Sequence, residues 1–179
     1  MANPYDECVT LDRVFVDSPN LGEPYSFLRN VITDNNFHDR TRMGRLLAFM
    51  ARLAQDGWTP AARAIAVDEL TALLVDAQGM AKVVDQRTET DRGSVCFLQA
   101  PGLPQHCRPK APLAYDNVGV YQVRAGDPAA SFDLRAWQGQ GAATTVCQQA
   151  KERCVLRSCL ITVRDSGSGP FPEESTDTP

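Results

Sequence analysis

The spacing of apolar residues between positions 39 and 78 constrains the fold most. From Asp39 to Gln55, apolar side chains recur every three or four residues, at Met43, Leu46, Leu47, Met50, Leu53 and Ala54. This spacing places them on one face of an α-helix. A second apolar stripe over residues 60–78 follows Thr59, a good N-cap, and Pro60, which suits the first helical position. Since only a few residues join the two stripes, the sequence predicts a helical hairpin.

The second half of the chain has the sequence patterns of β-strands. Residues 94–99 are predicted to form a strand. Residues 118–124 and 131–137 alternate between the two faces of a strand, and they are predicted to pair as a hairpin. Ser94 to Gln99 follows a polar break, and a loop rich in proline follows it at residues 100–113. The sequence therefore predicts an α+β fold, in which an N-terminal helical hairpin packs on a C-terminal, mostly antiparallel sheet.

Several shorter segments carry weaker patterns. They are expected to form a strand at 9–16, a short helix at 25–32, a brief helical stretch at 80–84, a short helix at 142–153 and a last strand at 154–163.

The charge distribution divides the chain into a body and a tail. Residues 165–179 hold four acidic residues and no Lys or Arg, and residues 1–164 hold 18 acidic and 18 basic residues, which together give the net charge of −4. The predicted organisation is one α+β domain over residues 1–164 and a disordered acidic tail, rich in Ser, Gly and Pro, over residues 165–179. A neutral body disfavours a charge-led nucleic-acid binder and makes self-association easier.

The motifs of common enzyme and cofactor sites are missing from the sequence. No phosphate-binding glycine loop and no nucleophile elbow is present. The six cysteines, at 8, 96, 107, 147, 154 and 159, lack the close pairing typical of zinc ligands. Neither a cofactor nor a metal is therefore expected. A cysteine nucleophile would need His38 or His106 as its base, which leaves a Cys-dependent hydrolase as one alternative.

One basic stripe is the candidate binding site. Arg42, Arg45, Phe49 and Arg52 are separated by three, four and three residues, so they share one side of the predicted helix. Such a face could contact phosphate or an acidic partner, and nucleic-acid binding is a second alternative. An ordinary solvated helix face explains the same pattern.

These observations favour a non-enzymatic interaction or assembly subunit, structural or regulatory, such as a viral protein or part of a large complex. The expected partner is another protein or a second copy, with nucleic acid as the weaker choice and no membrane. The first ten residues lack the apolar run of a secretory signal, and no run approaches the roughly 20 residues of a membrane span. A cytoplasmic or nuclear location is therefore expected.

Overall fold

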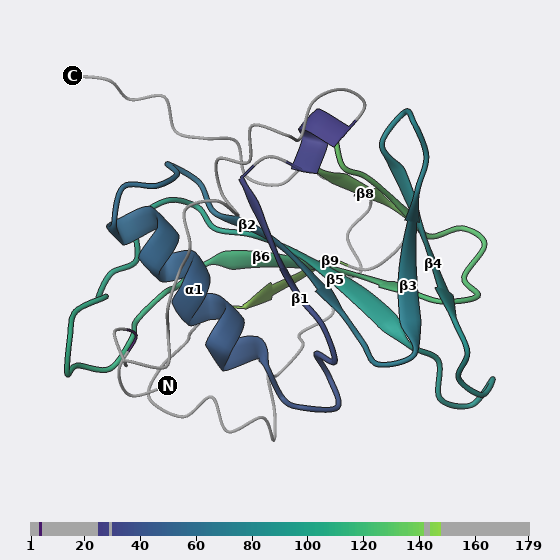
Figure 1. The fold of residues 1–179 in the computed structure, drawn as a ribbon, viewed down its shortest axis with the longest axis horizontal. Coiled ribbons are helices and arrows are strands. Elements are labelled where there is room, and N and C mark those ends of the chain that lie inside the picture. The colour runs from purple at the N-terminus through teal and green to yellow at the C-terminus, as the bar shows by residue number, and fades with distance from the viewer. Residues whose placement is uncertain (1–3, 5–24, 29, 142–143, 148–179) are drawn as a thin grey trace.

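The computed structural model describes residue 4 and residues 25–28, 30–141 and 144–147. Its elements follow the chain as η2 (Tyr25–Leu28), β1 (Val31–Asp34), α1 (Met43–Gln55), β2 (Arg63–Val67), β3 (Thr71–Val75), β4 (Met80–Asp85), β5 (Ser94–Gln99), β6 (Val118–Arg124), β7 (Ser131–Asp133), β8 (Gln138–Gln140) and β9 (Thr144–Cys147). The described chain is thus mostly β, with α1 as its one α-helix (Figure 1).

The strands form two sheets. The larger sheet has the order β1-β2-β5-β6-β9, and the smaller has the order β3-β4-β7-β8. All pairs are antiparallel except β1 with β2. The chain passes between the sheets four times, from β2 to β3, from β4 to β5, from β6 to β7 and from β8 to β9.

Two apolar clusters separate three layers. Under α1, Leu46 and Met50 pack with Leu98 and Val120 of the larger sheet. On the opposite face of that sheet, the second cluster includes Phe97, Tyr121, Phe132 and Trp137. Phe97 and Phe132 stack with ring centroids 3.8 Å apart. The larger sheet is therefore the middle layer, with α1 on one side and the smaller sheet on the other (Figure 1).

The predicted helical hairpin is wrong, because residues 60–78 form β2 and β3. Ala64 and Ala66 face α1, whereas Ile65 between them faces the smaller sheet. Alanine suits either structure, and burial on both faces of the middle sheet selects the strand. The apolar residues of these two strands, which are joined at a corner, have helical spacing by coincidence.

The first predicted helix is confirmed as α1, but it begins at Met43 instead of Asp39. The preceding residues form turns in which Asn36 and Thr41 have φ of 47° and 54°. The amide of Arg42 donates to the carbonyl of Phe37 at 3.0 Å. Left-handed residues cannot continue an α-helix, so the helix starts after them.

The strand predictions at 94–99 and 118–124 are confirmed as β5 and β6. The hairpin predicted between residues 118–124 and 131–137 is wrong, because β6 pairs with β5 and β9 while β7 pairs with β4 and β8. Their apolar side chains meet across the sandwich instead of along one sheet: Tyr121 and Phe132 have ring centroids 5.6 Å apart.

Three predicted helical segments contain strands. Residues 25–32 form a 3-10 turn and then begin β1, and residues 80–84 lie in β4. Within residues 142–153 the described part is β9, where Thr144, Thr145 and Val146 are β-branched and favour a strand. The strands predicted at 9–16 and 154–163 and the acidic tail at 165–179 lie outside the described residues.

Candidate functional site: an apolar edge strand

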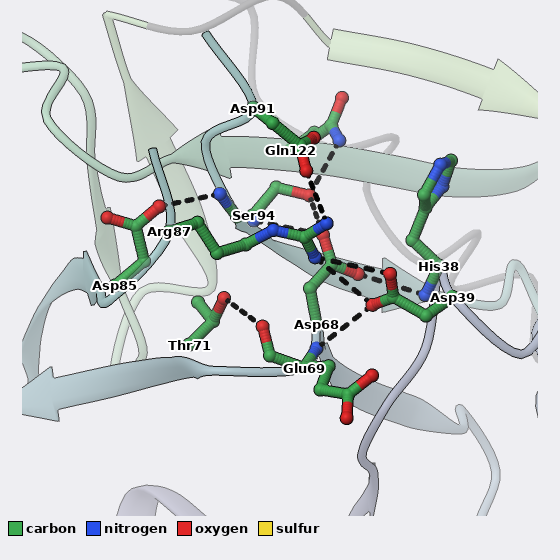
Figure 2. A network of polar contacts seen from close by, with 11 residues as sticks. His38, Asp39, Asp68, Glu69, Thr71, Asp85, Arg87, Asp91, Ser94 and Gln122 are labelled. Carbon is green, nitrogen blue, oxygen red and sulfur yellow. Dashed lines mark hydrogen bonds and ion pairs between the residues drawn. The ribbon is translucent and has the colours of Figure 1, made fainter. Parts of the chain in front are cut away.

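The corner between β2 and β3 is built around the buried carboxylate of Asp68. Its oxygens accept hydrogen bonds from the amide of His38 at 3.0 Å, the amide of Ser94 at 2.9 Å and the hydroxyl of Ser94 at 2.7 Å. The side-chain amide of Gln122 donates in turn to the Ser94 hydroxyl at 2.8 Å. Figure 2 shows these groups converging from four segments of the chain. A buried carboxylate satisfied in this way fixes the direction in which the chain leaves the middle sheet.

A second carboxylate supports the same corner from outside. Asp39 accepts hydrogen bonds from the amide of Glu69 at 3.3 Å and from Arg87 at 3.1 Å (Figure 2). The hydrogen bond from Arg87 is the main reason that the pKa of Asp39 lies below its ordinary value of 3.8. Asp39, in the β1–α1 connection, thus links the β2–β3 turn to the β4–β5 loop.

Asp85, at the end of β4, holds the start of β5. Its carboxylate accepts the amide of Gly93 at 2.7 Å and a hydrogen bond from Arg92 at 3.1 Å. The Gly93 amide, followed by Arg92, lowers the pKa of Asp85 below its ordinary value. The end of β4 is therefore joined to the start of β5.

From this corner β3 runs along the edge of the smaller sheet. Within the described residues β3 pairs with β4 alone. The amide of Gln86 donates to the carbonyl of Leu70, and the amide of Asp76 donates to the carbonyl of Met80. Hydrogen-bonded and non-hydrogen-bonded pairs alternate along an antiparallel ladder. The backbone N–H and C=O groups of the even-numbered residues of β3 therefore point toward β4. The backbone groups of Thr71, Leu73 and Val75 therefore point to the open edge.

The outer face of β3 and β4 is apolar. Leu74 is 55% exposed and Val84 is 43% exposed. Ala72, which pairs with Val84, and Lys82, which pairs with Leu74, complete this surface. We call Ala72, Leu74, Lys82 and Val84 the outer apolar face. Clustered apolar side chains next to an open strand are a feature of protein-binding surfaces.

Leu70 lies at the corner itself and has an unusual backbone. Its φ is 55°, in the left-handed region, and its side chain is 62% exposed. A left-handed leucine costs conformational energy, and such residues concentrate at sites of function. The carbonyl of Leu70 accepts the amide of Gln86 at 2.9 Å, so this backbone is fixed against the chain that follows β4.

The strands at the other three sheet edges are shorter than β3. β1 and β9 have four residues each, and β8 has three. β1 ends at Asp34, and natural sheets blunt their edges with short strands and charged residues. β3 has the sequence TALLV, without charge, proline or glycine, and its hydrogen-bonded ladder extends from Leu70 to Asp76.

The arginines of the predicted basic stripe pair with acidic residues of the chain itself. Arg42 and Arg45 both bind the carboxylate of Asp34 at the end of β1, Arg42 at 3.3 Å and Arg45 through Nε at 3.2 Å and through Nη2. Arg52 binds Asp56 through two hydrogen bonds of 3.1 Å. Phe49 is half-buried between the two groups. The stripe is thus divided into two ion-pair clusters at opposite ends of α1, and ligand binding by it stays a prediction.

Two of the six thiols, those of Cys96 and Cys107, lie at the apolar cluster under α1. Cys107 is buried in the cluster under α1, and Cys96 is half-buried against it. His38 enters the corner network through its backbone amide. Asp68 bonds Ser94 directly, whereas a base-activated serine needs the imidazole between them. A Cys-dependent hydrolase stays a hypothesis. One candidate nucleophile, Cys8, lies outside the described residues.

A buried phenol lies close to Cys107. The hydroxyl of Tyr115 donates to the carbonyl of Gly102 at 2.8 Å, and burial is the main cause that raises the pKa of Tyr115. This contact anchors the proline-rich loop beneath α1.

The described residues contain neither a candidate metal site nor a candidate membrane span. No group of three His, Cys, Asp or Glu side chains there is placed to hold a metal ion. No helix in that part of the chain is both long and apolar enough to cross a membrane. Comparison with protein-family models, curated proteins and solved structures finds no match for the chain.

The edge strand was missed from sequence because β3 falls inside the predicted second helix. One local signal marks it. Asp76, Ala77, Gln78 and Gly79 separate two apolar runs, and such a tetrad is typical of a turn. In the structure Asp76 accepts the amides of Gln78 and Met80, and Gly79 has φ of 92°.

Proposed function

We propose that this chain is a non-enzymatic interaction subunit, which binds an extended polypeptide strand on the open edge of β3. The observation that carries the proposal is the combination of an uncharged edge strand with the outer apolar face beside it. Backbone groups of the edge would supply hydrogen bonds, and Leu74 and Val84 would supply apolar contact area.

The same surface supports binding more than catalysis. The polar side chains that converge at the corner are committed to holding backbone amides, as Asp68 and Asp85 do. These side chains position β3, so few of their polar atoms remain to bind or activate a substrate. We propose that the subunit works in the cytoplasm or nucleus.

A peptide-display selection tests the proposal. A library of nine-residue peptides would be selected on the wild-type chain, with removal of peptides that also bind the Leu74→Lys variant. We expect enriched peptides with apolar residues at alternate positions, and weaker binding when their backbone amides are methylated, because the edge recognises an extended backbone.

The matched control is Leu103→Lys, which makes the same change at a leucine 65% exposed in the proline-rich loop. Peptide binding should survive this change. Failure to enrich any peptide that distinguishes the wild type from Leu74→Lys, or loss of binding in Leu103→Lys as well, would contradict the proposal.

The nucleic-acid alternative makes a different prediction. It requires salt-sensitive binding that is lost when Arg42, Arg45 and Arg52 are changed to Ala, and that strengthens when residues 165–179 are removed. The ion pairs with Asp34 and Asp56 favour the interaction-subunit proposal over this alternative.

A further inference from the structure

We infer that the strand accepted by β3 is β3 of a second copy of this chain, paired antiparallel about Leu73. The inference rests on the proposed function and names its partner. It joins the two smaller sheets into one continuous sheet across the dimer.

The hydrogen-bonding pattern of β3 selects this register. The open edge presents the backbone groups of Thr71, Leu73 and Val75. A two-fold axis at Leu73 pairs it with its own copy, and it pairs Thr71 with Val75 of the second copy and the reverse. Each such pair exchanges two hydrogen bonds. Every other antiparallel register leaves at least one of these residues unpaired.

The outer apolar face is self-complementary in the same register. Ala72 lies opposite Leu74 of the second copy, at a position where side chains approach most closely. Within one chain Val84 already lies beside Ala72. The partly exposed Leu74 of one copy therefore packs on the small Ala72 of the other, close to its Val84, and both copies cover apolar surface.

Charge does not oppose the pairing. The acidic residue at the end of the ladder, Asp76, lies opposite Leu70 of the second copy, and its carboxylate already accepts two amides of its own turn. Lys82 is the single charge on the outer apolar face. The two copies of Lys82 are separated by three strand spacings of about 4.8 Å each, which exceeds the Debye length of about 8 Å at physiological salt.

The interface between the two β3 strands is small, because only one short strand from each copy takes part. A stable complex buries about 1,200 Å² or more, so we expect a reversible dimer whose population rises with concentration. Sedimentation equilibrium over a wide concentration range measures this directly.

The wild-type chain should show a concentration-dependent dimer, Leu74→Lys should remain monomeric, and Leu103→Lys should behave as wild type. Circular dichroism confirms that each variant is folded. A dimer that forms equally well in Leu74→Lys would overturn the inference, since the charged side chain would lie in the interface between the two β3 strands.

Cross-linking tests the register. In the proposed pairing the Cα atoms of Ala72 and Leu74 of the second copy are about 4.5 Å apart, within the range for a disulfide. Mixing Ala72→Cys with Leu74→Cys under mild oxidation should give a disulfide-linked pair at least tenfold more abundant than in either variant alone. Equal yields in the single-variant samples would contradict this register.

The two proposals fail in different ways. A wild-type chain that stays monomeric while selected peptides still bind through β3 would overturn the second copy as partner and leave the strand-binding function standing. A monomer that also enriches no peptide would overturn both.

Discussion

The two outer layers of the molecule pack on the same middle sheet but present opposite surfaces to solvent. On α1, arginines that suggest a binding face fold back onto Asp34 and Asp56. On the smaller sheet, Leu74 and Val84 remain exposed beside an edge strand. The comparison teaches that a conspicuous charge pattern can be used within the chain, while an inconspicuous apolar strand is left for a partner.

The largest expected effect comes from Asp68, on which both outer layers depend. Asp68→Ala would leave the amides of His38 and Ser94 without their acceptor in a buried corner. Each unsatisfied group costs roughly 1–3 kcal/mol, so we expect a loss of about 4 kcal/mol in the free energy of unfolding. Urea denaturation measures it.

Asp127→Ala is the control, because Asp127 accepts a single amide in an exposed turn. A loss below about 1 kcal/mol for Asp68→Ala would show that the corner does not depend on this carboxylate.

Two leucines compare the layers directly. Leu46 on α1 is fully buried, whereas Leu74 on β3 is 55% exposed. We expect Leu46→Ala to lower the free energy of unfolding by about 3 kcal/mol, and Leu74→Ala by less than about 1 kcal/mol in dilute solution. Similar losses in thermal or urea unfolding would mean that Leu74 is covered within the monomer, which would break the comparison.

The ion pairs of α1 give the next effect. Asp34→Ala removes a buried carboxylate that binds both Arg42 and Arg45, and we expect a loss of about 2 kcal/mol because both arginines are partly exposed. Asp56→Ala breaks the pair with Arg52 within one helix turn, which is worth about 0.5 kcal/mol. Equal losses in urea denaturation would contradict the assignment of Asp34 as the anchor of the helix.

The smallest effect is a pH dependence at the ends of the strands. The pKa of Asp85 in the fold lies below its ordinary value of 3.8, so the ionised form is favoured by folding. This contribution is complete above about pH 4 and is lost as the pH falls through the lowered pKa. Unfolding measured from pH 5 to pH 2 should therefore depend less on pH in Asp85→Asn than in the wild type, and an unchanged profile would contradict it.

The parts of the fold that could be predicted are those specified locally. The spacing from Met43 to Ala54 indicates a helix, residues 94–99 form a short apolar run after a polar break, and residues 118–124 alternate, so α1, β5 and β6 could be predicted. Residues 60–78 were not, because alanine and leucine fit both periods and the choice depends on the two layers that bury Ala64 and Ile65.

The candidate site depends on contacts that are distant along the chain. Asp68 binds groups 30 and 26 residues away, and Arg45 binds an aspartate 11 residues away. No local pattern contains these partners. The arginine stripe could be seen from sequence while its neutralisation could not, and the edge of β3 could not be seen until its neighbours in the sheet were known.

Amide hydrogen exchange along β3 tests the central claim most directly. In dilute solution we expect the amides of Ala72 and Leu74, which face β4, to exchange slowly, and those of Thr71, Leu73 and Val75 to exchange fast. On concentration, the three fast amides should become protected in the wild type but not in Leu74→Lys. Uniform protection of all five amides in the dilute sample would contradict the account, because the edge of β3 would then be covered within a single chain.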